Sequence, residues 1–383
     1  MNISRRDAMK LFAGSIPAYY ANHAVVLAAN ETSTPASNAA ESIGLKDAFK
    51  GKFLIGTAGD LPGGFNEAEL ANVIKNYDIV TPENCMKPEG VQRTEGNFTF
   101  ERPDALVEWA QQNSIKVWGH TLCWHSQSPR WFLQGTREEA LARLQKHIET
   151  VVGHYEGKLL GWDVVNEAIA DGGDGKTENL RQSNMNQTTW YKLVGPDVLN
   201  KAFEWAHKAD SKAILYYNDY NIEQDAADDS GKHPSSLLLL KRLLDEGAPI
   251  NGVGIQGHWH LDTRIENIEK AILNYKALGL EVAVTELDVT AIGTNSGAFG
   301  GFGRRGAAMD PEEQAKLFEQ QAEIYSKIFK IIMNNADVVK RVTFWGISDT
   351  RSWRRGQNAL IFDGQMNPKP AYEAVLNVGL GKS

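Results

Sequence analysis

The sequence predicts an α/β protein, a single (β/α)8 TIM barrel. Three observations support this fold class. Apolar β-type runs alternate with helical patterns along the chain, and eight such runs can be counted, each followed by a helix. Nearly every run ends in polar or aromatic residues, as expected where strand ends meet at one rim. The 383 residues are also enough for one such barrel. An open doubly wound sheet is the alternative, but no glycine-rich dinucleotide turn follows an early strand.

The expected strands are short runs of β-branched, aromatic and other apolar residues, bounded by polar or turn-forming residues. The fourth run, LGWDVVN, and the seventh, EVAVT, show this composition well. In chain order the expected strands cover 53–57, 77–81, 116–120, 160–166, 213–218, 252–256, 281–285 and 341–345.

The expected helices have apolar residues at helical spacing, and several carry start signals. Pro196 and Pro311 stand at first-turn positions, and Asp310 is suited to cap the helix that begins at Pro311. In chain order the helices cover 66–76, 104–113, 137–154, 196–209, 234–246, 265–278, 311–334 and 371–378.

The N-terminus differs in character from the rest of the chain. A pair of arginines, Arg5 and Arg6, precedes a weakly apolar stretch with small residues near its end. This pattern predicts an export signal of twin-arginine type over 1–29, and therefore an exported protein, periplasmic or secreted. Residues 30–44 have linker composition and are expected to be disordered. The barrel domain then covers 45–383.

Composition limits the partners and the cross-links of this chain. The net charge is −8 without a block of like charges, which argues against nucleic acid and fits a neutral polymeric substrate. The apolar N-terminal stretch is too short and too interrupted to span a membrane. We expect a monomer. Cys85 and Cys123 each follow a predicted strand, so a single disulfide and two free thiols are both open.

Two predicted strands end directly in a glutamate, Glu167 and Glu286. Burying an unpaired carboxylate is costly, so two strands tipped by glutamate suggest a function, although a salt-bridged structural role is the alternative for each. Two carboxylates that meet in space can hydrolyse a glycosidic bond. A separation of about 5–5.5 Å gives retention of configuration and a larger one gives inversion. The sequence does not supply this distance.

The neighbours of the two glutamates suggest different roles. Asp288 shares a strand face with Glu286 and could orient His258, whose other nitrogen would contact Glu286 and keep it ionised as a nucleophile. Glu167, beside Asn166, suits the general acid, because the nearby charge of Glu286 is expected to raise its pKa.

Tryptophans near the predicted rim suggest a sugar ligand. The C–H faces of sugar rings stack on indoles, and indole N–H groups donate to hydroxyls. Trp124, Trp259, Trp345 and Trp353 lie near rim positions, and we interpret Trp345 and Trp353 as a substrate floor. Core packing is the default for the other tryptophans.

Two further features have competing interpretations. His258 and His260 form a His-x-His pair that metallohydrolase barrels also use, but no further ligand set with clear spacing appears, so no metal is expected. The glycine-rich segment 293–306 is a flap near the site or a flexible surface loop.

Six segments taken together resemble glycoside hydrolase family 10, whose members are (β/α)8 endo-β-1,4-xylanases. The resemblance runs from about Leu45 to about Val378, with the motifs in family order. They are ENCMK at 83–87, GHTLCWH at 119–125, DVVNE at 163–167, YNDYN at 217–221, GIQGHW at 254–259 and TELD at 285–288.

This resemblance implies a retaining endo-β-1,4-xylanase that acts on xylan and xylo-oligosaccharides by double displacement. It implies Glu286 as nucleophile, Glu167 as acid/base, and no cofactor. Tyr217 resembles an aromatic residue of the first leaving-group subsite. The sugars on the non-reducing side would be bound by Glu83, Asn84, Lys87, His120, Trp124, Asn166, Gln256, His258, Trp345 and Trp353.

Three rival functions stay open at this stage. The first is a β-1,4-glucanase or a barrel hydrolase of mixed specificity, the second a catalytically silent xylan-binding protein, and the third a metal-dependent hydrolase. The longer 293–306 segment also leaves the tolerance for branched xylan open.

Overall fold

The computed structural model describes residues 43–185, 187–291 and 310–382, and residues 43–383 form one compact unit. The predicted signal at 1–29, most of the predicted linker and the 293–306 segment lie outside the described residues. Within the described ranges no helix is long and apolar enough to cross a lipid bilayer.

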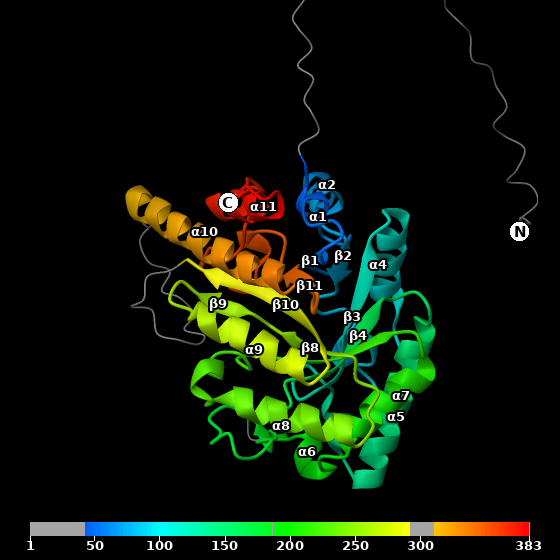
Figure 1. The fold of residues 1–383 in the computed structure, drawn as a ribbon. Coiled ribbons are helices and arrows are strands. Elements are labelled where there is room, and N and C mark those ends of the chain that lie inside the picture. The colour runs from blue at the N-terminus through cyan, green and yellow to red at the C-terminus, as the bar shows by residue number, and fades with distance from the viewer. Residues whose placement is uncertain (1–42, 186, 292–309, 383) are drawn as a thin grey trace, which may run out of the picture. The chain divides into compact units, whose positions relative to one another are not determined.

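Eight parallel strands close into a barrel, which confirms the predicted (β/α)8 fold (Figure 1). Their order around the barrel is β11-β1-β2-β3-β4-β7-β8-β10, and β10 pairs with β11 to complete the ring. The strands are β1 (Leu54–Ala58), β2 (Ile79–Thr81), β3 (Lys116–Trp124), β4 (Gly161–Asn166), β7 (Ile214–Asp219), β8 (Gly252–Ile255), β10 (Glu281–Thr290) and β11 (Val339–Phe344).

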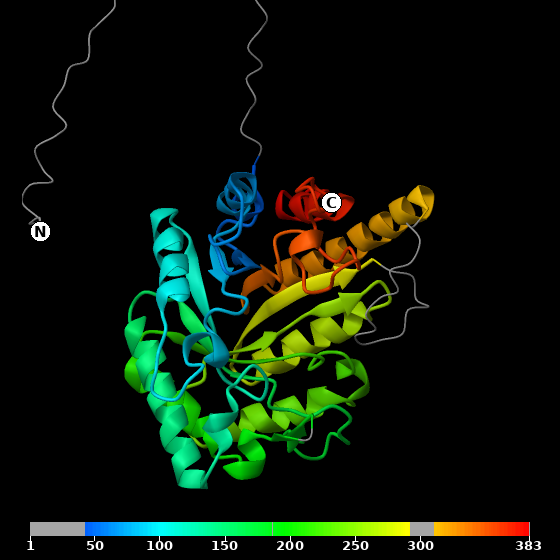
Figure 2. The same ribbon diagram turned by 180° about the vertical axis from the view of Figure 1, so that it is seen from behind.

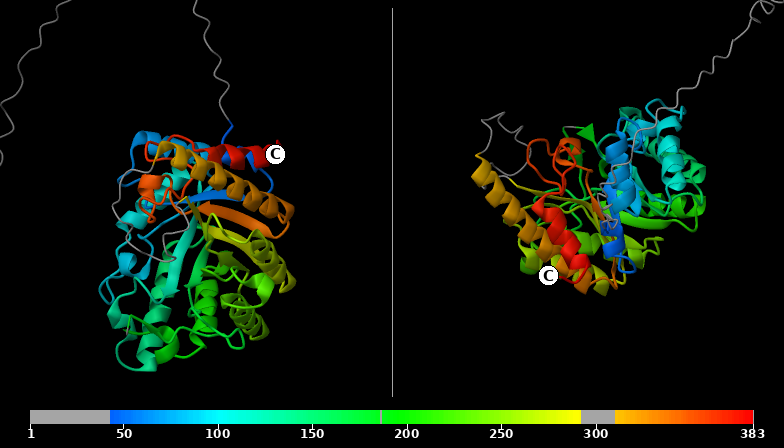
Figure 3. Two further views of the ribbon diagram at one scale, coloured as in Figure 1. Left: turned by 90° about the vertical axis from the view of Figure 1, so that its left-hand side faces the viewer. Right: turned by 90° about the horizontal axis from the view of Figure 1, so that it is seen from above.

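Helices cover the outside of the barrel, and the view from behind shows the same layer (Figures 1 and 2). Of these, α10 and α11 lie side by side (Figure 3). The helices are α1 (Leu45–Ala48), α2 (Glu67–Asn76), α3 (Pro88–Val91), α4 (Glu101–Gln112), α5 (Arg137–His154), α6 (Trp190–Leu193), α7 (Val198–Ala209), α8 (Lys232–Asp245), α9 (Ile265–Ala277), α10 (Pro311–Asn334) and α11 (Pro370–Gly379).

The predicted helix starts are confirmed in one case and shifted in the other. Asp310 caps α10, since its side chain accepts from the backbone N–H groups of Glu312 and Glu313. The helix predicted to begin at Pro196 begins two residues later, at Val198.

Two strands are longer than predicted, and both extend into the site. β3 continues through Trp124, and β10 continues through Glu286 and Asp288 to Thr290. The polar residues there do not end β10, because it pairs with an additional short strand, β9 (His258–His260), with Asp288 opposite His258. A two-stranded hairpin of β5 (Ser183–Asn184) and β6 (Gln187–Thr188) was also not predicted.

Large rings fill the barrel interior below the rim, and glycines on neighbouring strands make room for them. A Cβ on Gly161 would lie 2.7 Å from the ring of Trp118, and one on Gly252 would lie 2.5 Å from the ring of Tyr216. Both rings are buried, and they meet edge to face with centroids 4.9 Å apart. This packed layer leaves the rim above it as the place for polar side chains.

Candidate active site

The carboxyl ends of β4, β8 and β10 bring the predicted catalytic residues to one rim. Glu167 directly follows β4, Gln256 directly follows β8, and Glu286 and Asp288 stand within β10. Backbone bonds hold these ends together: the Glu167 N–H donates to the Asn218 carbonyl at 2.8 Å, and the Glu286 N–H to the Gln256 carbonyl at 2.7 Å.

Glu286 lies in a buried and positively charged environment. Glu286 is 5% exposed. Asn218 donates to Oε1 at 2.8 Å, and Nε2 of His258 lies 3.3 Å from Oε2. Burial alone would raise the pKa of Glu286, but the hydrogen bond from His258 and the charges of His120 and His258 outweigh it, so the pKa lies below its ordinary value.

Asp288 supports His258 from the other side of the imidazole, as predicted. Nδ1 of His258 lies 3.0 Å from Oδ2 of Asp288, whose side chain is fully buried. Burial disfavours a charged imidazole, but Asp288 and Glu286 more than compensate and raise the pKa of His258 to about 9. His258 is therefore a cation between two carboxylates at neutral pH.

Two residues from the segment after β11 also reach Asp288. Trp353 donates its indole N–H to Oδ2 at 2.9 Å, and Nε of Arg354 lies 2.8 Å from Oδ1. Arg354 was not predicted, because it belongs to a connecting segment without periodic pattern.

The side chains that donate hydrogen bonds to Glu167 at 3.0 Å or less are uncharged. Trp124 donates to Oε2 at 2.9 Å, and Gln256 donates to Oε1 at 3.0 Å. Nε2 of His125 lies 3.8 Å from Oε2, and burial, helped by the charge of Arg181, lowers the pKa of His125 to about 4, so this imidazole is neutral near pH 7.

The backbone of Glu167 is left-handed, with φ at 57°. This conformation is uncommon for residues other than glycine, asparagine and aspartate, and it costs about 1–2 kcal/mol. It turns the chain sharply at the end of β4 and so aims the Glu167 side chain toward Trp124 and Gln256.

Two amide side chains connect the surroundings of the two glutamates. The side-chain amides of Asn166 and Asn218 approach to 2.9 Å. Asn218 donates to Glu286, and the amide of Asn166 lies 3.4 Å from Oε1 of Glu167. Asn218 was not among the predicted site residues, although it follows Tyr217 directly on β7.

A second polar group lies next to Trp124. Lys87, nearly buried, donates to Oδ1 of Asn84 at 3.3 Å and to Oε1 of Gln127 at 2.8 Å. Burial lowers the pKa of Lys87, although the charges of Glu286 and Glu83 oppose this effect. Gln127, from the connection after β3, was not predicted.

Glu83 is half-buried beside this group. Burial raises the pKa of Glu83, against the charge of Lys87. A carboxyl group and an amine can both form hydrogen bonds with sugar hydroxyls, so Glu83 and Lys87 are suited to bind a sugar.

His120 is held within β3 and faces a tryptophan. Its Nδ1 lies 2.9 Å from Oδ2 of Asp163, whose other oxygen accepts from the indole of Trp118 at 2.9 Å. The His120 ring meets the Trp345 ring edge to face with centroids 5.3 Å apart. Trp345 is 7% exposed, whereas Trp353 is 54% exposed.

Tyr217 does not lie where the sequence analysis placed it. It is fully buried and its hydroxyl donates to Asp219. Successive strand residues face opposite sides, so Asn218 points to Glu286 and Tyr217 must point away. The aromatic residue just past the end of this strand is the half-buried Tyr220, whose hydroxyl donates to Asp171 at 2.7 Å.

Trp259 is a second correction. It was placed near the rim, but it is fully buried and donates to Oε1 of Glu223 at 2.7 Å. His258 and Trp259 alternate along β9 as Asn218 and Tyr217 alternate along β7, so His258 faces the site and Trp259 faces away from it.

The described residues bear on two further questions, whether the two cysteines form a disulfide and whether a metal could bind. Cys85 and Cys123 are buried free thiols, so they are not bridged. In the part of the chain that the structure describes, no group of three or more His, Cys, Asp or Glu residues could hold a metal ion. The imidazole of His260 contacts the hydroxyl of Thr290 at 2.8 Å.

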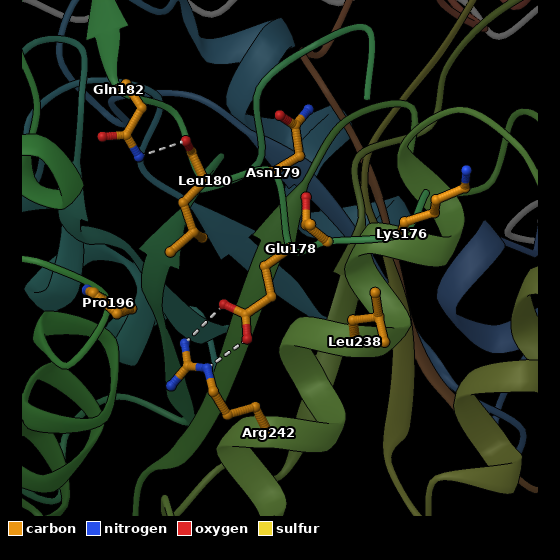
Figure 4. A pocket seen from close by; sticks show the side chains of 9 residues that line it. Lys176, Glu178, Asn179, Leu180, Gln182, Pro196, Leu238 and Arg242 are labelled. Carbon is orange, nitrogen blue, oxygen red and sulfur yellow. Dashed lines mark hydrogen bonds and ion pairs between the residues drawn. The ribbon is translucent and has the colours of Figure 1, made fainter. Parts of the chain in front are cut away.

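A hollow of about 700 Å³ lies outside this site (Figure 4). Within it Arg242 pairs with Glu178, with Nε 2.5 Å from Oε1 and Nη2 3.0 Å from Oε2. None of the predicted site residues lines it, so it is not the candidate active site. The lining residues are Lys176, Thr177, Glu178, Asn179, Leu180, Gln182, Pro196, Leu238 and Arg242.

A (β/α)8 barrel with two glutamates at its carboxyl rim, one paired with a cation, has the arrangement that glycoside hydrolases use. The chain belongs to glycosyl hydrolase family 10, since the model of that family matches residues 44–378.

Two curated relatives show how far the similarity extends. The β-1,4-xylanase of Dictyoglomus thermophilum is 39% identical over 337 residues, which are 86% of this chain and 89% of the relative. The exoglucanase XynX of Acetivibrio thermocellus is 37% identical over 348 residues, 86% of this chain. This chain spans only 29% of the length of XynX.

Among solved structures, the xylanase TsXylA of Thermoanaerobacterium saccharolyticum is similar throughout. Its complex with xylotriose matches 88% of this chain and 99% of its own, with 35% identity and a TM-score of 0.75.

The prediction of an exported protein, periplasmic or secreted, is wrong. The TsXylA structures that this chain resembles are described as those of an intracellular xylanase. The prediction depended on Arg5, Arg6 and a weakly apolar stretch, and polar residues interrupt that stretch, so it lacks the continuous apolar core of a strong signal.

Proposed function

We propose that this chain is an endo-β-1,4-xylanase that retains anomeric configuration, with Glu286 as nucleophile and Glu167 as acid/base. The observation that carries the proposal is the contrast between the two carboxylates. Glu286 is paired with the cation His258 at 3.3 Å, whereas the donors to Glu167 are the neutral side chains Trp124 and Gln256.

In the first step Glu286 attacks the anomeric carbon while Glu167 gives its proton to the departing glycosidic oxygen. The C–O bond to the leaving sugar breaks, and an ester bond forms between Glu286 and the sugar. His258 and Asn218 hold the two oxygens of Glu286, which leaves the carboxylate ionised and limits its rotation.

In the second step Glu167, now ionised, takes a proton from a water molecule that attacks the anomeric carbon. The ester bond breaks, Glu286 returns to a carboxylate, and the sugar leaves with its original configuration. A contact between Glu167 and neutral groups suits a residue that must be protonated in one step and ionised in the next.

Aromatic and polar side chains around the glutamates suit a polymer of sugars. Trp345 and Trp353 supply a floor for the sugars on the non-reducing side, and Lys87, Asn84 and His120 supply polar contacts there. On the leaving-group side we assign Tyr220 in place of the buried Tyr217.

The names of the relatives support xylan as the substrate. The relative from Dictyoglomus thermophilum is named a β-1,4-xylanase. Two TsXylA structures hold glutamate-to-alanine variants, one with xylotriose and one with xylotetraose. Glutamate replacement in complexes with xylo-oligosaccharides agrees with a catalytic role for glutamates in this family.

The test is proton NMR of the products released from unbranched β-1,4-xylohexaose. We expect internal cleavage with newly formed β-anomers, which then mutarotate to the equilibrium mixture. Initial α-anomers would mean inversion, with water attacking directly. No cleavage by folded protein would exclude the xylanase proposal.

A β-1,4-glucanase is the second candidate, because one relative is named an exoglucanase. Glucose carries a hydroxymethyl group that xylose lacks, and this group must fit beside Trp345 and Trp353. Rates on xylan and on a soluble cellulose derivative, measured side by side, separate the two. Faster cleavage of the cellulose derivative would favour the glucanase.

A further inference from the structure

The segment that carries Trp353 is anchored at several points. Arg351 binds Glu69 of α2 through two contacts, Nε to Oε1 at 2.7 Å and Nη2 to Oε2 at 2.9 Å. Asp349, at the start of the segment, pairs with the nearly buried Lys369 at 3.1 Å. These contacts fix the base of the segment and leave Trp353 half-exposed at the rim.

Two residues in the middle of the segment contact Asp288, which supports the proposed nucleophile through His258. Trp353 and Arg354 are adjacent in sequence, and each contacts a different oxygen of Asp288. The indole N–H donates to Oδ2 at 2.9 Å, and Nε of Arg354 lies 2.8 Å from Oδ1. The Arg354 side chain is 12% exposed, and its guanidinium lies 4.9 Å from the centre of the Trp353 ring.

Among the described ion pairs of Glu286 and Asp288, positive and negative charges are equal in number only when Arg354 is counted. Glu286 and Asp288 are two carboxylates, and His258 between them supplies one positive charge. Arg354 supplies the second. A buried carboxylate without a full partner is costly, so Asp288 would otherwise share the single cation with Glu286.

We propose that Arg354 is a positioning residue for Glu286, which acts through Asp288 and His258 and ties the aim of the nucleophile to the placement of Trp353. This inference rests on the proposed function, because it assumes that Glu286 is the nucleophile.

The contacts around Asp288 explain how Arg354 acts on the direction of Glu286. The ion pair between Arg354 and Oδ1 adds to the contacts of Trp353 and His258 with Oδ2, so it limits rotation of the Asp288 carboxylate and keeps Oδ2 directed at Nδ1 of His258. Nε2 of His258 then stays 3.3 Å from Glu286. Without Arg354 the carboxylate and the imidazole gain freedom, and Glu286 loses its fixed direction. Because this freedom affects the reacting geometry, it lowers kcat more than it raises KM.

The experiment compares four variants on two substrates. Arg354→Met removes the charge with similar length, and Arg354→Lys keeps a charge. Arg355→Met is the matched control, since Arg355 is exposed and one residue further along. Arg351→Met loosens the segment from Glu69 without touching Asp288. The substrates are xylohexaose and an aryl β-xylobioside with a good leaving group.

We expect Arg354→Met to lower kcat by about 10- to 100-fold on both substrates, the usual range for a residue that orients a functional side chain. Arg354→Lys should recover most of this loss. Arg355→Met should change little, and Arg351→Met should raise KM without a matching loss of kcat.

Several results would overturn the inference. Arg354→Met could leave kcat within about twofold, or Arg351→Met could lower kcat as much as Arg354→Met does, which would mean a general loosening of the segment. Wild-type protein inactive on both substrates would instead exclude the proposed function.

A double-mutant cycle tests the path through Asp288. In an Asp288→Asn background, Arg354→Met should cost less than about twofold in kcat, because its target is already altered. Independent losses that multiply would contradict a path through Asp288. Thermal unfolding of every variant checks the fold, and Arg354→Gln takes the place of Arg354→Met if the latter does not fold.

Discussion

The end of β4 and the middle of β10 both carry a glutamate at the same rim, but the side chains that contact the two glutamates differ in charge. Around Glu286 stand a cation, His258, and behind it a buried carboxylate, Asp288. Around Glu167 stand the indole of Trp124, the amide of Gln256 and a neutral imidazole.

Under the proposed roles, this difference gives two identical side chains two different tasks on one scaffold. A cation at hydrogen-bond distance keeps a carboxylate ionised, which a nucleophile needs throughout. A carboxyl group can accept a hydrogen bond from a neutral donor whether it is protonated or ionised, which suits a group that gives and takes a proton. Substitutions around the two glutamates should therefore differ in kind, with the largest effects at the glutamates themselves.

The largest effect should follow Glu286→Gln. Without an ionised nucleophile no ester can form, so kcat on xylohexaose should fall by about 10⁴- to 10⁶-fold. The substitution is close in shape, so the fold should be retained. Initial rates and thermal unfolding measure the two parts. Substantial residual turnover by this variant would remove Glu286 from the nucleophile role.

Glu167→Gln should have an effect that depends on the leaving group. On xylan, whose leaving group needs a proton, the rate should fall by about 10²- to 10⁴-fold. On an aryl xylobioside with a good leaving group, the first step should lose little, and a burst of phenol should precede slow turnover. Rapid-mixing measurements detect the burst. Equal losses on both substrates would contradict the acid role.

His258 should make stability depend on pH. Its pKa is about 9 in the folded chain and about 6.5 when unfolded, so the folded state binds its proton more tightly. The resulting stabilisation, on the order of 3 kcal/mol, is fully present below pH 6.5 and is lost as pH rises through 9. Chemical unfolding of wild type and His258→Gln at pH 6 and 9.5 measures it. A wild-type protein that loses no more stability than the variant would show that His258 is not held as a cation.

The smallest effect should follow Trp124→Phe. It keeps an aromatic ring but removes the donor 2.9 Å from Glu167, so the rate on xylan should fall by about 3- to 10-fold, the value of one hydrogen bond. Trp353→Phe is the matched change on the other side, since it removes a donor from Asp288. If the loss depends on the leaving group only for Trp124→Phe, the contrast between the two regions holds.

Some of this site could be predicted because periodicity determines which residues share a face. Glu286 and Asp288 are two apart on one strand, and their contacts with His258 follow from that spacing. The barrel itself follows from the eight alternating runs.

Other parts could not be predicted from pattern. Resemblance and aromatic character predict Tyr217 and Trp259 at the site, but the alternation of side chains along β7 and β9 turns both rings away from it. Gln127 and Arg354 come from connecting segments, whose course depends on packing against the whole barrel. The export prediction failed because a short N-terminal pattern has little specificity.

The left-handed backbone at Glu167 has a consequence for how far this enzyme can be stabilised. Asparagine and glycine accept a φ of 57° more readily than glutamate does, so Glu167→Asn or Glu167→Gly should relieve about 1 kcal/mol of backbone strain, although it leaves the donors of Trp124 and Gln256 without their acceptor. The same change removes the carboxyl group that we propose as the acid. The backbone at this position therefore favours residues that lack the carboxyl group required by the proposed function, so part of the stability of the chain is given up for that function.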